Sequence, residues 1–175
     1  YFNGEGVKES DKKAAKWFRL AADQGQTQAQ YILGILYGAG DGVPRSGKQS
    51  AKWYRLAAEE GHTQAQYNLG VLYDNGEGVT RDDEEAAKWY RLAAEEGHTQ
   101  AQYNLGVLYD NGEGVPLDDK EAAKWYRLAA EEGYTKAQYN LGLMYENGEG
   151  VTQDDEEAAK WYRLAAEEGH TQSQY

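Results

Sequence analysis

The sequence contains no cysteine and no long apolar run, and each absence removes a class of protein. Without cysteine there is no disulfide framework, and thiolate zinc sites and iron–sulfur clusters are excluded. No apolar run approaches the ~20 residues of a membrane span, so we expect no membrane insertion. The compartment stays open, because a cysteine-free chain suits cytoplasm, periplasm and secretion alike.

The chain also lacks an initiator methionine. It begins at Tyr1 and ends at Tyr175, and both residues lie inside a repeated unit. We therefore expect a piece of a longer protein, and the missing signal peptide carries no information.

Basic residues are scarce in the later part of the chain. Residues 1–60 carry nine Lys/Arg against seven Asp/Glu (+2), whereas residues 61–175 carry nine against twenty-three (−14). Such an acidic surface repels phosphate backbones, which argues against a nucleic-acid partner. It would steer a basic protein or peptide towards the chain. Solubility alone explains the acidity equally well.

What the sequence does contain is one unit that returns every 36 residues. The interval is kept by three aromatic series: Trp17, Trp53, Trp89, Trp125 and Trp161; Tyr31, Tyr67, Tyr103, Tyr139 and Tyr175; and Tyr1, Tyr37, Tyr73, Tyr109 and Tyr145. A fixed period of this size predicts a stacked array whose units cannot bury their apolar faces alone. We expect one array with a partial repeat 1–26, full repeats 27–62, 63–98, 99–134 and 135–170, and a partial repeat 171–175.

The repeats are nearly identical to one another. Units 63–98 and 99–134 differ at four positions only: Thr80/Pro116, Arg81/Leu117, Glu84/Lys120 and His98/Tyr134. This similarity indicates recent duplication or consensus design. A surface that repeats so closely favours binding over catalysis.

Each unit predicts two helices. In unit 63–98 the first helix opens at Thr63 with Gln66 three residues on, a capping box. This pattern recurs at Thr27/Gln30, Thr99/Gln102, Thr135/Gln138 and Thr171/Gln174. The helix is expected to end near Asp74, before glycines that tolerate a positive φ angle.

The second helix opens at Asp82, again with a capping box because Glu85 follows. It is expected to end at Gly97, with equivalents at Gly25, Gly61, Gly133 and Gly169. In repeat 27–62, Gly47 and Ser50 stand where Asp83 and Ala86 stand later, which predicts a looser helix start.

Helical periodicity separates the faces of both helices. On the first helix we expect the core side to hold Ala65, Leu69, Leu72 and Tyr73, with Gly70 allowing close helix approach. On the second helix we expect Ala86, Trp89, Tyr90 and Ala93 to point inwards, and Lys88, Arg91 and Glu95 to point to water.

The opposite side of the first helices is the candidate binding surface. Its predicted residues are Tyr31, Tyr67, Tyr103, Tyr139, Asn68, Asn104, Asn140, Val71, Val107, Asp74 and Asp110. Tyrosine and asparagine combine apolar area with hydrogen bonding, which suits peptide capture. In the alternative interpretation, the tyrosines hold adjacent first helices together; both roles can coexist.

The sequence gives little support for a metal site or a catalytic site. His62, His98 and His170 precede the first helices about 10 Å apart, too far for shared metal ligation, and are expected to be solvated turn residues. The loops around Asp74–Gly78 lack the ligand pattern of calcium loops. No nucleophile–base or phosphate-loop motif is present, so we expect no enzyme, metal or cofactor.

The motif Ala65…Leu69-Gly70…Tyr73…Gly76-x-Gly78-Val79…Asp82…Ala86…Trp89-Tyr90…Ala93-Ala94…Gly97 resembles the Sel1-like repeat, a relative of the tetratricopeptide repeat with a longer loop. The resemblance implies an all-α, right-handed α/α superhelical solenoid with the first helices on its concave side. It also implies a scaffold or adaptor role, often in bacterial proteins. Some cysteine-rich relatives are linked to β-lactam binding or hydrolysis, which this cysteine-free chain leaves a distant alternative.

These expectations converge on a protein- or peptide-binding scaffold that uses the concave groove. The alternative is a purely architectural or consensus-designed array without a natural ligand, which the low variation of groove positions favours mildly. Apolar terminal faces predict end-to-end self-association.

Overall fold

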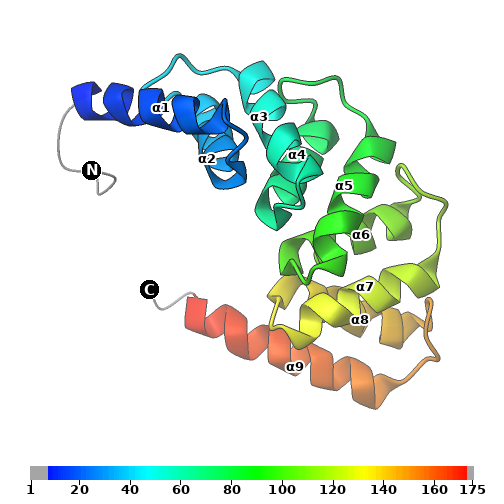
Figure 1. Ribbon diagram of the computed structural model, residues 1–175. Helices are drawn as coiled ribbons and strands as arrows, with labels where there is room; N and C mark the ends of the chain where they lie inside the picture. The colour runs from blue at the N-terminus through cyan, green and yellow to red at the C-terminus, as the bar shows by residue number, and fades with distance from the viewer. Residues whose placement is uncertain (1–7, 173–175) are drawn as a thin grey trace. The chain divides into compact units, whose positions relative to one another are not determined.

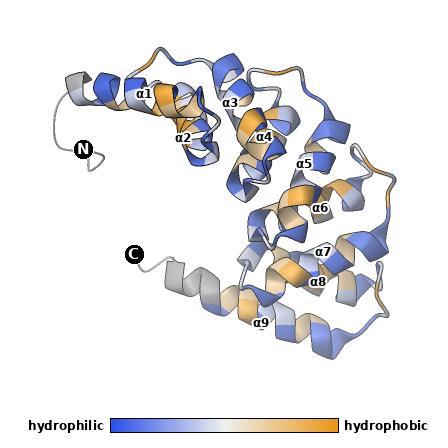
Figure 2. Ribbon diagram, viewed as in Figure 1, coloured by the Kyte–Doolittle hydropathy of each residue, from blue (hydrophilic) through white to orange (hydrophobic). Residues whose placement is uncertain are grey.

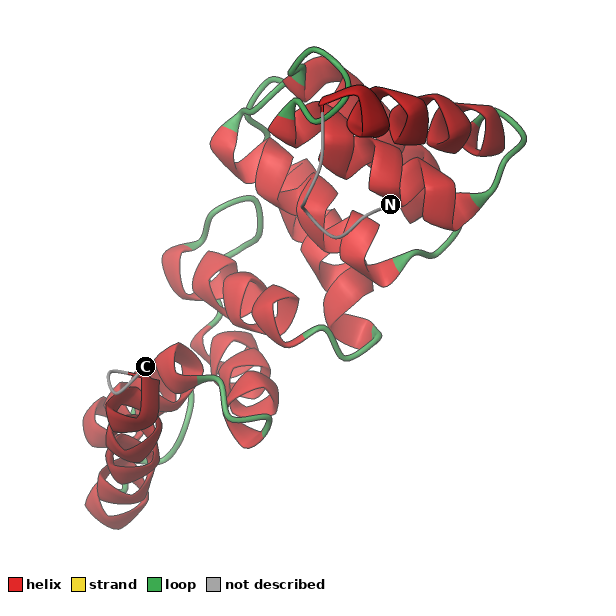
Figure 3. Ribbon diagram, turned by 90° about the vertical axis from the view of Figure 1, so that its left-hand side faces the viewer, coloured by secondary structure: helices red, strands yellow, loops and turns green. Residues whose placement is uncertain are grey.

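The computed structural model describes residues 8–172, and this range consists of helices joined by short connections, with no strand (Figures 1 and 3). Its helices are α1 (Lys8–Ala22), α2 (Thr27–Ala39), α3 (Gly47–Glu59), α4 (Thr63–Asn75), α5 (Asp83–Glu95), α6 (Thr99–Asn111), α7 (Asp119–Glu131), α8 (Thr135–Asn147) and α9 (Asp155–Gln172). The predicted two helices per unit are confirmed, and the fold is an all-α repeat solenoid.

The chain divides into two compact units. The N-terminal unit comprises residues 1–89 and the C-terminal unit residues 90–175, with the boundary inside α5. Within the N-terminal unit, α2 packs against α1 and α3, and α3 packs against α4. Within the C-terminal unit, α7 packs against α6 and α8, and α8 packs against α9. Each unit is therefore a stack of consecutive helices.

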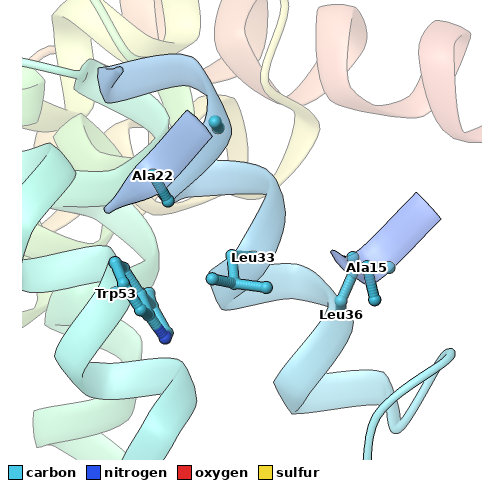
Figure 4. Packing of buried hydrophobic residues seen from close by; sticks show 6 residues of the cluster. Ala15, Ala22, Leu33, Leu36 and Trp53 are labelled. Atoms are coloured by element: carbon cyan, nitrogen blue, oxygen red, sulfur yellow. The ribbon is translucent and has the colours of Figure 1, made fainter. Parts of the chain in front are cut away.

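The core combines small and large side chains as the periodicity predicts. In the N-terminal unit, Trp53 of α3 faces Leu33 of α2, and Ala15 and Ala22 of α1 complete the cluster (Figure 4). Ala65 and Leu69 in α4 and Ala86 in α5 are fully buried, and Trp89 is 5% exposed. Figure 2 shows more hydrophobic colour on α2 and α4 than on α3, in agreement with the predicted amphipathic second helices.

The predicted capping boxes of the first helices are wrong. These helices begin at the threonines themselves, so the preceding residue is the N-cap. The ring Nδ1 of His62 accepts a hydrogen bond from the N–H of Ala65 at 3.3 Å, and His98 does the same for Ala101. Gln26 and Tyr134 make no side-chain cap bond. The copy at Thr171/Gln174 extends outside the described residues.

The glutamines of those expected boxes are instead buried between helices. The Nε2 of Gln66 donates to the carbonyl oxygen of Ala58 at 3.2 Å, and the same bond joins Gln30 to Ala22, Gln102 to Ala94 and Gln138 to Ala130. Each glutamine adds a second hydrogen bond to a carbonyl in the last turn of the preceding helix, which also accepts from the backbone N–H three residues later. Burial of that helix end favours this use of the side chain over a cap.

The second helices confirm half of their predicted box. Asp82 accepts from the N–H of Glu85 at 3.0 Å, with equivalents at Ser46, Asp118 and Asp154. The side chain of Glu85 does not accept from the backbone N–H of Asp82, because that N–H already donates to the carbonyl of Tyr73. It accepts instead from Lys88 and from the indole N–H of Trp89, each at 3.1 Å.

The looser start expected for α3 is not seen. Ser46 caps this helix, which begins at Gly47 as its equivalents begin at Asp83 and Asp119. Ser50 is buried, and its hydroxyl donates to the carbonyl of Gly34 at 2.8 Å. The polar atom at this core position therefore has a partner, and the hydrogen bond offsets the cost of removing the hydroxyl from water.

The loops between paired helices explain the Gly-x-Gly motif. Gly148 and Gly150 have φ angles of +74° and +67°, the left-handed region that glycine tolerates. A Cβ added to Gly150 would overlap the carbonyl of Asp119, and one added to Gly78 would overlap Gly47. The loop of each such repeat thus rests directly on the first turn of the preceding second helix.

The predicted helix end at Gly169 is wrong. Helix α9 continues through Gly169 to Gln172, whereas the equivalents Gly25, Gly61, Gly97 and Gly133 adopt positive φ angles. A glycine inside a helix costs only about 1 kcal/mol. The turn at the other four glycines therefore depends also on the packing of the helix that follows.

Arg91 was also misplaced by the sequence pattern. It is half-buried, and its guanidinium donates to the hydroxyl of Tyr109 at 2.5 Å, with the guanidinium carbon 5.6 Å from the ring centroid. The same pair recurs as Arg19–Tyr37, Arg55–Tyr73 and Arg127–Tyr145. Each arginine ties a second helix to the first helix of the next repeat.

Candidate functional site

The predicted surface residues lie on the first helices and are mostly half-buried. Tyr139 of α8 is the exception, with 52% of its surface exposed. The half-buried positions are Tyr31, Tyr67, Tyr103, Asn68, Asn104, Asn140, Val71, Val107, Asp74 and Asp110. They do not form an open surface of equal accessibility.

Tyr31 and Tyr103 pack against residues that precede the next first helix. The ring of Tyr31 stacks on His62 with centroids 4.4 Å apart, and the ring of Tyr103 lies 5.1 Å from that of Tyr134. These contacts join α2 to the start of α4, and α6 to the start of α8. The structural role that the sequence left open for these tyrosines is therefore present, and each ring keeps only part of its surface for a ligand.

His62 is half-buried rather than a solvated turn residue. Besides capping α4 and stacking on Tyr31, its Nε2 lies 3.1 Å from the side-chain oxygen of Gln28. Burial lowers the pKa of His62 below its ordinary value. A neutral ring with the proton on Nε2 satisfies both bonds. Among the side chains that the structure describes, those of residues 10–167, no three His, Asp or Glu residues are grouped so as to hold a metal.

Sequence reasoning missed the tyrosines that second helices contribute to this region. The rings of Tyr54, Tyr126 and Tyr162 lie over Gly34, Gly106 and Gly142; a Cβ at Gly106 would come within 2.7 Å of the Tyr126 ring. A glycine in a helix interior, destabilising by itself, was the available signal. The glycines admit these aromatic rings rather than another helix backbone.

The hydroxyls of these tyrosines bind acidic residues of the first helices. Tyr126 donates to Asp110 at 3.1 Å, and Tyr162 donates to Glu146 at 2.5 Å. Asn140 also hydrogen-bonds to the hydroxyls of Tyr103 and Tyr126. The C-terminal unit therefore presents a network of aromatic hydroxyls, amides and carboxylates.

Protonation states in this network follow from burial and like charges. Burial raises the pKa of Asp110; nearby Asp119 and Glu149 raise it further, and the hydrogen bond from Tyr126 opposes them. Burial and then Asp110 raise the pKa of Tyr126. Burial and Glu146 raise the pKa of Tyr162 to about 12. At neutral pH the hydroxyls stay protonated, so they act as hydrogen-bond donors.

One open cavity of about 690 Å³ lies in the C-terminal unit, and we name it the α8–α9 cavity. It is lined by Tyr103, Thr135, Lys136, Tyr139, Asn140, Leu143, Glu146, Tyr162, Ala165 and Ala166. Its volume lies in the range of ligand-binding clefts. Aromatic walls with a few polar groups suit the capture of side chains from another molecule.

None of the helices in residues 8–172 has the length and apolarity needed to cross a bilayer.

The family model of the Sel1 repeat matches residues 1–26, 27–62, 63–98, 99–134 and 135–170. No curated protein matches the chain at the significance required.

Several solved structures are similar to this chain. A protective antigen of uropathogenic Escherichia coli, c5321, which displays an SLR fold, is 46% identical with a TM-score of 0.87 over 90% of this chain and 34% of its own. A Sel1 repeat protein from Oxalobacter formigenes is 37% identical with a TM-score of 0.80 over 90% of this chain and 63% of its own. Helicobacter pylori cysteine rich protein B is 25% identical with a TM-score of 0.58, over 77% of this chain and 97% of its own.

The chain thus spans about a third of the first structure's length and less than two thirds of the second's. The match of the repeat model nevertheless extends over five consecutive repeats, residues 1–170. The chain belongs to the Sel1 repeat family.

Proposed function

We propose that this chain is a non-catalytic interaction scaffold whose α8–α9 cavity captures a segment of a partner protein. Sel1 repeats generally act as protein-interaction scaffolds, and this role supports the proposal. The observation that carries it is the cavity itself, which combines a volume of about 690 Å³ with three tyrosine rings.

The composition of the cavity suits a peptide with both apolar and polar groups. Tyrosine is enriched among residues that dominate binding energy at interfaces. Tyr139 exposes half of its surface there, and Lys136 and Glu146 supply one charge of each sign. Beyond the cavity, the excess of acidic residues after residue 60 favours a partner with basic segments.

The rest of the predicted groove is a secondary part of the proposal. Tyr31 and Tyr103 use one side of their rings for packing, as described, and offer the remainder to a partner. Asp110 and Glu146 hold tyrosine hydroxyls and keep further acceptor capacity for a basic side chain.

A peptide-array screen tests this function with a matched pair of variants. Tyr139→Ser removes an exposed ring of the cavity, whereas Leu117→Ser removes a 63% exposed apolar side chain outside it. We expect Tyr139→Ser to weaken peptide binding about tenfold or more and Leu117→Ser to leave it unchanged, with equal helicity by circular dichroism. If Tyr139→Ser leaves the peptide affinity unchanged, the α8–α9 cavity is not the binding site. If no peptide binds, the architectural array is the better interpretation.

A further inference from the structure

The exposed side of helix α7 carries a short pattern of charge and apolar surface, which we name the α7 outer face. It consists of Lys124, Leu128, Glu131 and Glu132, and all four side chains are exposed. The neighbouring second helices repeat this pattern, with Lys52, Leu56, Glu59 and Glu60 in α3, Lys88, Leu92, Glu95 and Glu96 in α5, and Lys160, Leu164 and Glu167 in α9.

The exposure of this face does not depend on where the sequence begins or stops. Helix α7 lies between α6 and α8 and packs against both. Leu128 is 38% exposed, Leu92 of the preceding repeat is also 38% exposed, and Leu164 of the following repeat is 36% exposed. Because these values agree over three successive repeats, adjacent repeats do not cover the leucine. Its exposure is therefore a property of the repeat itself.

The lysine on this face is held in place and keeps its charge available. Its Nζ lies 3.1 Å from a carboxylate oxygen of Glu121 and 5.0 Å from the centroid of the Trp125 ring. An ammonium group has three donors, and an exposed ion pair contributes little to stability. Lys124 can therefore bind a second carboxylate without a large loss.

The glutamates on this face lie where the helix itself disfavours them. Glu131 is the last residue of α7 and Glu132 is its C-cap. The helix dipole opposes negative charge at a C-terminus. Within the described part of the chain, neither glutamate has an ion-pair partner. A cation supplied from outside would therefore stabilise both.

The two kinds of charge are spaced symmetrically about Leu128. Lys124 precedes it by four residues, and Glu131 and Glu132 follow it by three and four. At a rise of 1.5 Å per residue, both charges lie about 5–6 Å from the leucine along the helix axis. When two such helices lie antiparallel, leucine against leucine, the lysine of each comes over the glutamates of the other.

We propose that the α7 outer face binds the same face of a second copy of the chain about a two-fold axis. Leu128 packs against Leu128 of the second copy at the centre, and a Lys124–glutamate contact lies on either side. A parallel arrangement would place lysine over lysine, so the charges select the antiparallel one. A face that is complementary to itself is the requirement for such a dimer. The interface lies outside the α8–α9 cavity and does not rest on the proposed function.

This interface is expected to be weak. One helix face buries less than the roughly 800 Å² per partner of a standard interface. The net charge of −12 also opposes association. Salt at about 0.15 M screens charges more than about 8 Å apart, whereas pairs in contact are screened less. We expect a dissociation constant of about 0.1–1 mM under these conditions.

Sedimentation equilibrium of the full chain, at up to about 1 mM and in about 0.15 M salt, tests the interface. Lys124→Glu places like charges opposite each other and should weaken association at least tenfold. Lys120→Glu is the matched control, because it makes the same change of charge at an exposed site of α7 about 12 Å from Leu128. It should leave association unchanged.

A charge exchange tests whether the two copies face each other as proposed. Glu131→Lys/Glu132→Lys should weaken association as Lys124→Glu does. An equimolar mixture of the two variants should regain the wild-type affinity, because each lysine-rich face then meets a glutamate-rich one.

The apolar centre of the interface is tested separately. Leu128→Ser should weaken association at least tenfold. Leu117→Ser removes a 63% exposed leucine outside the face and should leave association unchanged. Equal helicity by circular dichroism shows that all variants keep the fold.

Each outcome decides the inference. Association that Lys124→Glu weakens and the mixture of charge variants restores supports the proposed dimer. If the chain stays monomeric at about 1 mM, the dimer is wrong, and the face is open to water or to a different protein. Association that Lys124→Glu leaves unchanged, or that the mixture does not restore, arises from another surface and also overturns the inference.

Discussion

The helix pair α2–α3 of the N-terminal unit and the pair α6–α7 of the C-terminal unit share a framework and differ in their polar chemistry. In both, a tyrosine of the second helix lies over a glycine of the first, Tyr54 over Gly34 and Tyr126 over Gly106. Gly38, however, stands where Asp110 stands two repeats later. The hydroxyl of Tyr126 therefore binds the Asp110 carboxylate as well as Asn140, whereas that of Tyr54 has side-chain hydrogen bonds to Asn68 and Ser50.

The difference shows how one repeat can change its surface without changing its fold. Helix starts, glycine contacts and arginine–tyrosine pairs are the same in both pairs. Among the differences are the positions that can supply a partner for the tyrosine hydroxyl, Gly38 and Ser50 in one pair against Asp110 and Ala122 in the other. The framework and the surface should therefore respond differently to substitution.

The shared framework should give the largest effect. We expect Gly150→Ala to lower the free energy of unfolding by about 3 kcal/mol, because it combines a positive φ angle with overlap against the Asp119 carbonyl. Gly97→Ala has a similar φ angle but open space around its Cβ, and should cost about 1 kcal/mol. Urea unfolding of the two variants measures the difference; equal losses would show that the loop contact is unimportant.

The difference in hydrogen bonding between the two helix pairs should appear when the hydroxyls of Tyr126 and Tyr54 are removed. Tyr126→Phe should cost about 2 kcal/mol, since Asp110 loses a donor, whereas Tyr54→Phe should cost about 1 kcal/mol. In an Asp110→Asn background the cost of Tyr126→Phe should fall to about 1 kcal/mol. Thermal unfolding of all four variants completes the cycle, and identical costs for the two tyrosines would contradict the comparison.

Histidine caps should make α4 and α6 sensitive to acid, unlike α8, which begins after Tyr134. The folded-state pKa values of His62 and His98 lie below the ordinary 6.5, chiefly through burial. Their stabilising contribution is therefore present above pH 6.5 and is lost as the pH falls from 6.5 towards the lowered values. In His62→Asn the new side chain still caps α4 but does not titrate. The variant should therefore lose about 0.5–1 kcal/mol less of its free energy of unfolding on acidification. Unfolding curves between pH 5 and 8 measure it.

Asp110 should give the smallest effect, with the opposite sign. Its pKa in the folded chain is raised above the ordinary 3.8, so stability falls as the pH rises between these two values. Above that window its buried charge remains a cost, and Asp110→Asn should raise the melting temperature at pH 7 by about one or two degrees. The gain should vanish below pH 3.8; a gain that persists there would have another cause.

Much of the fold could be predicted from the 36-residue period. Helix number, the loop glycines and the buried Ala, Leu and Trp positions follow from periodicity, because each unit must bury the same face. The resemblance to Sel1 repeats supplied the family. The errors fall where two helices meet: Thr63 and Gln66 suggested a local cap, and Arg91 suggested a solvated face. Sequence spacing describes one helix and does not describe its neighbour.

The candidate site was predictable only in outline. Tyr103, Tyr139, Asn140 and their copies were found from the repeat. Their unequal exposure was not, because it depends on which rings pack against a neighbouring helix. Tyr162 was missed for the same reason. Its ring lies over Gly142, and its hydroxyl donates to Glu146 on the adjacent helix.

By itself the sequence determined the repeat, its two helices, its turns and its apolar faces, since these depend on local propensity and on a period read along one chain. Tertiary structure alone decided the partners of Gln66 and Arg91, the packing of the tyrosines and the existence of the α8–α9 cavity. The physical reason is that a buried polar group is stabilised by a hydrogen-bond partner, and a partner can lie on any helix that packing brings within reach.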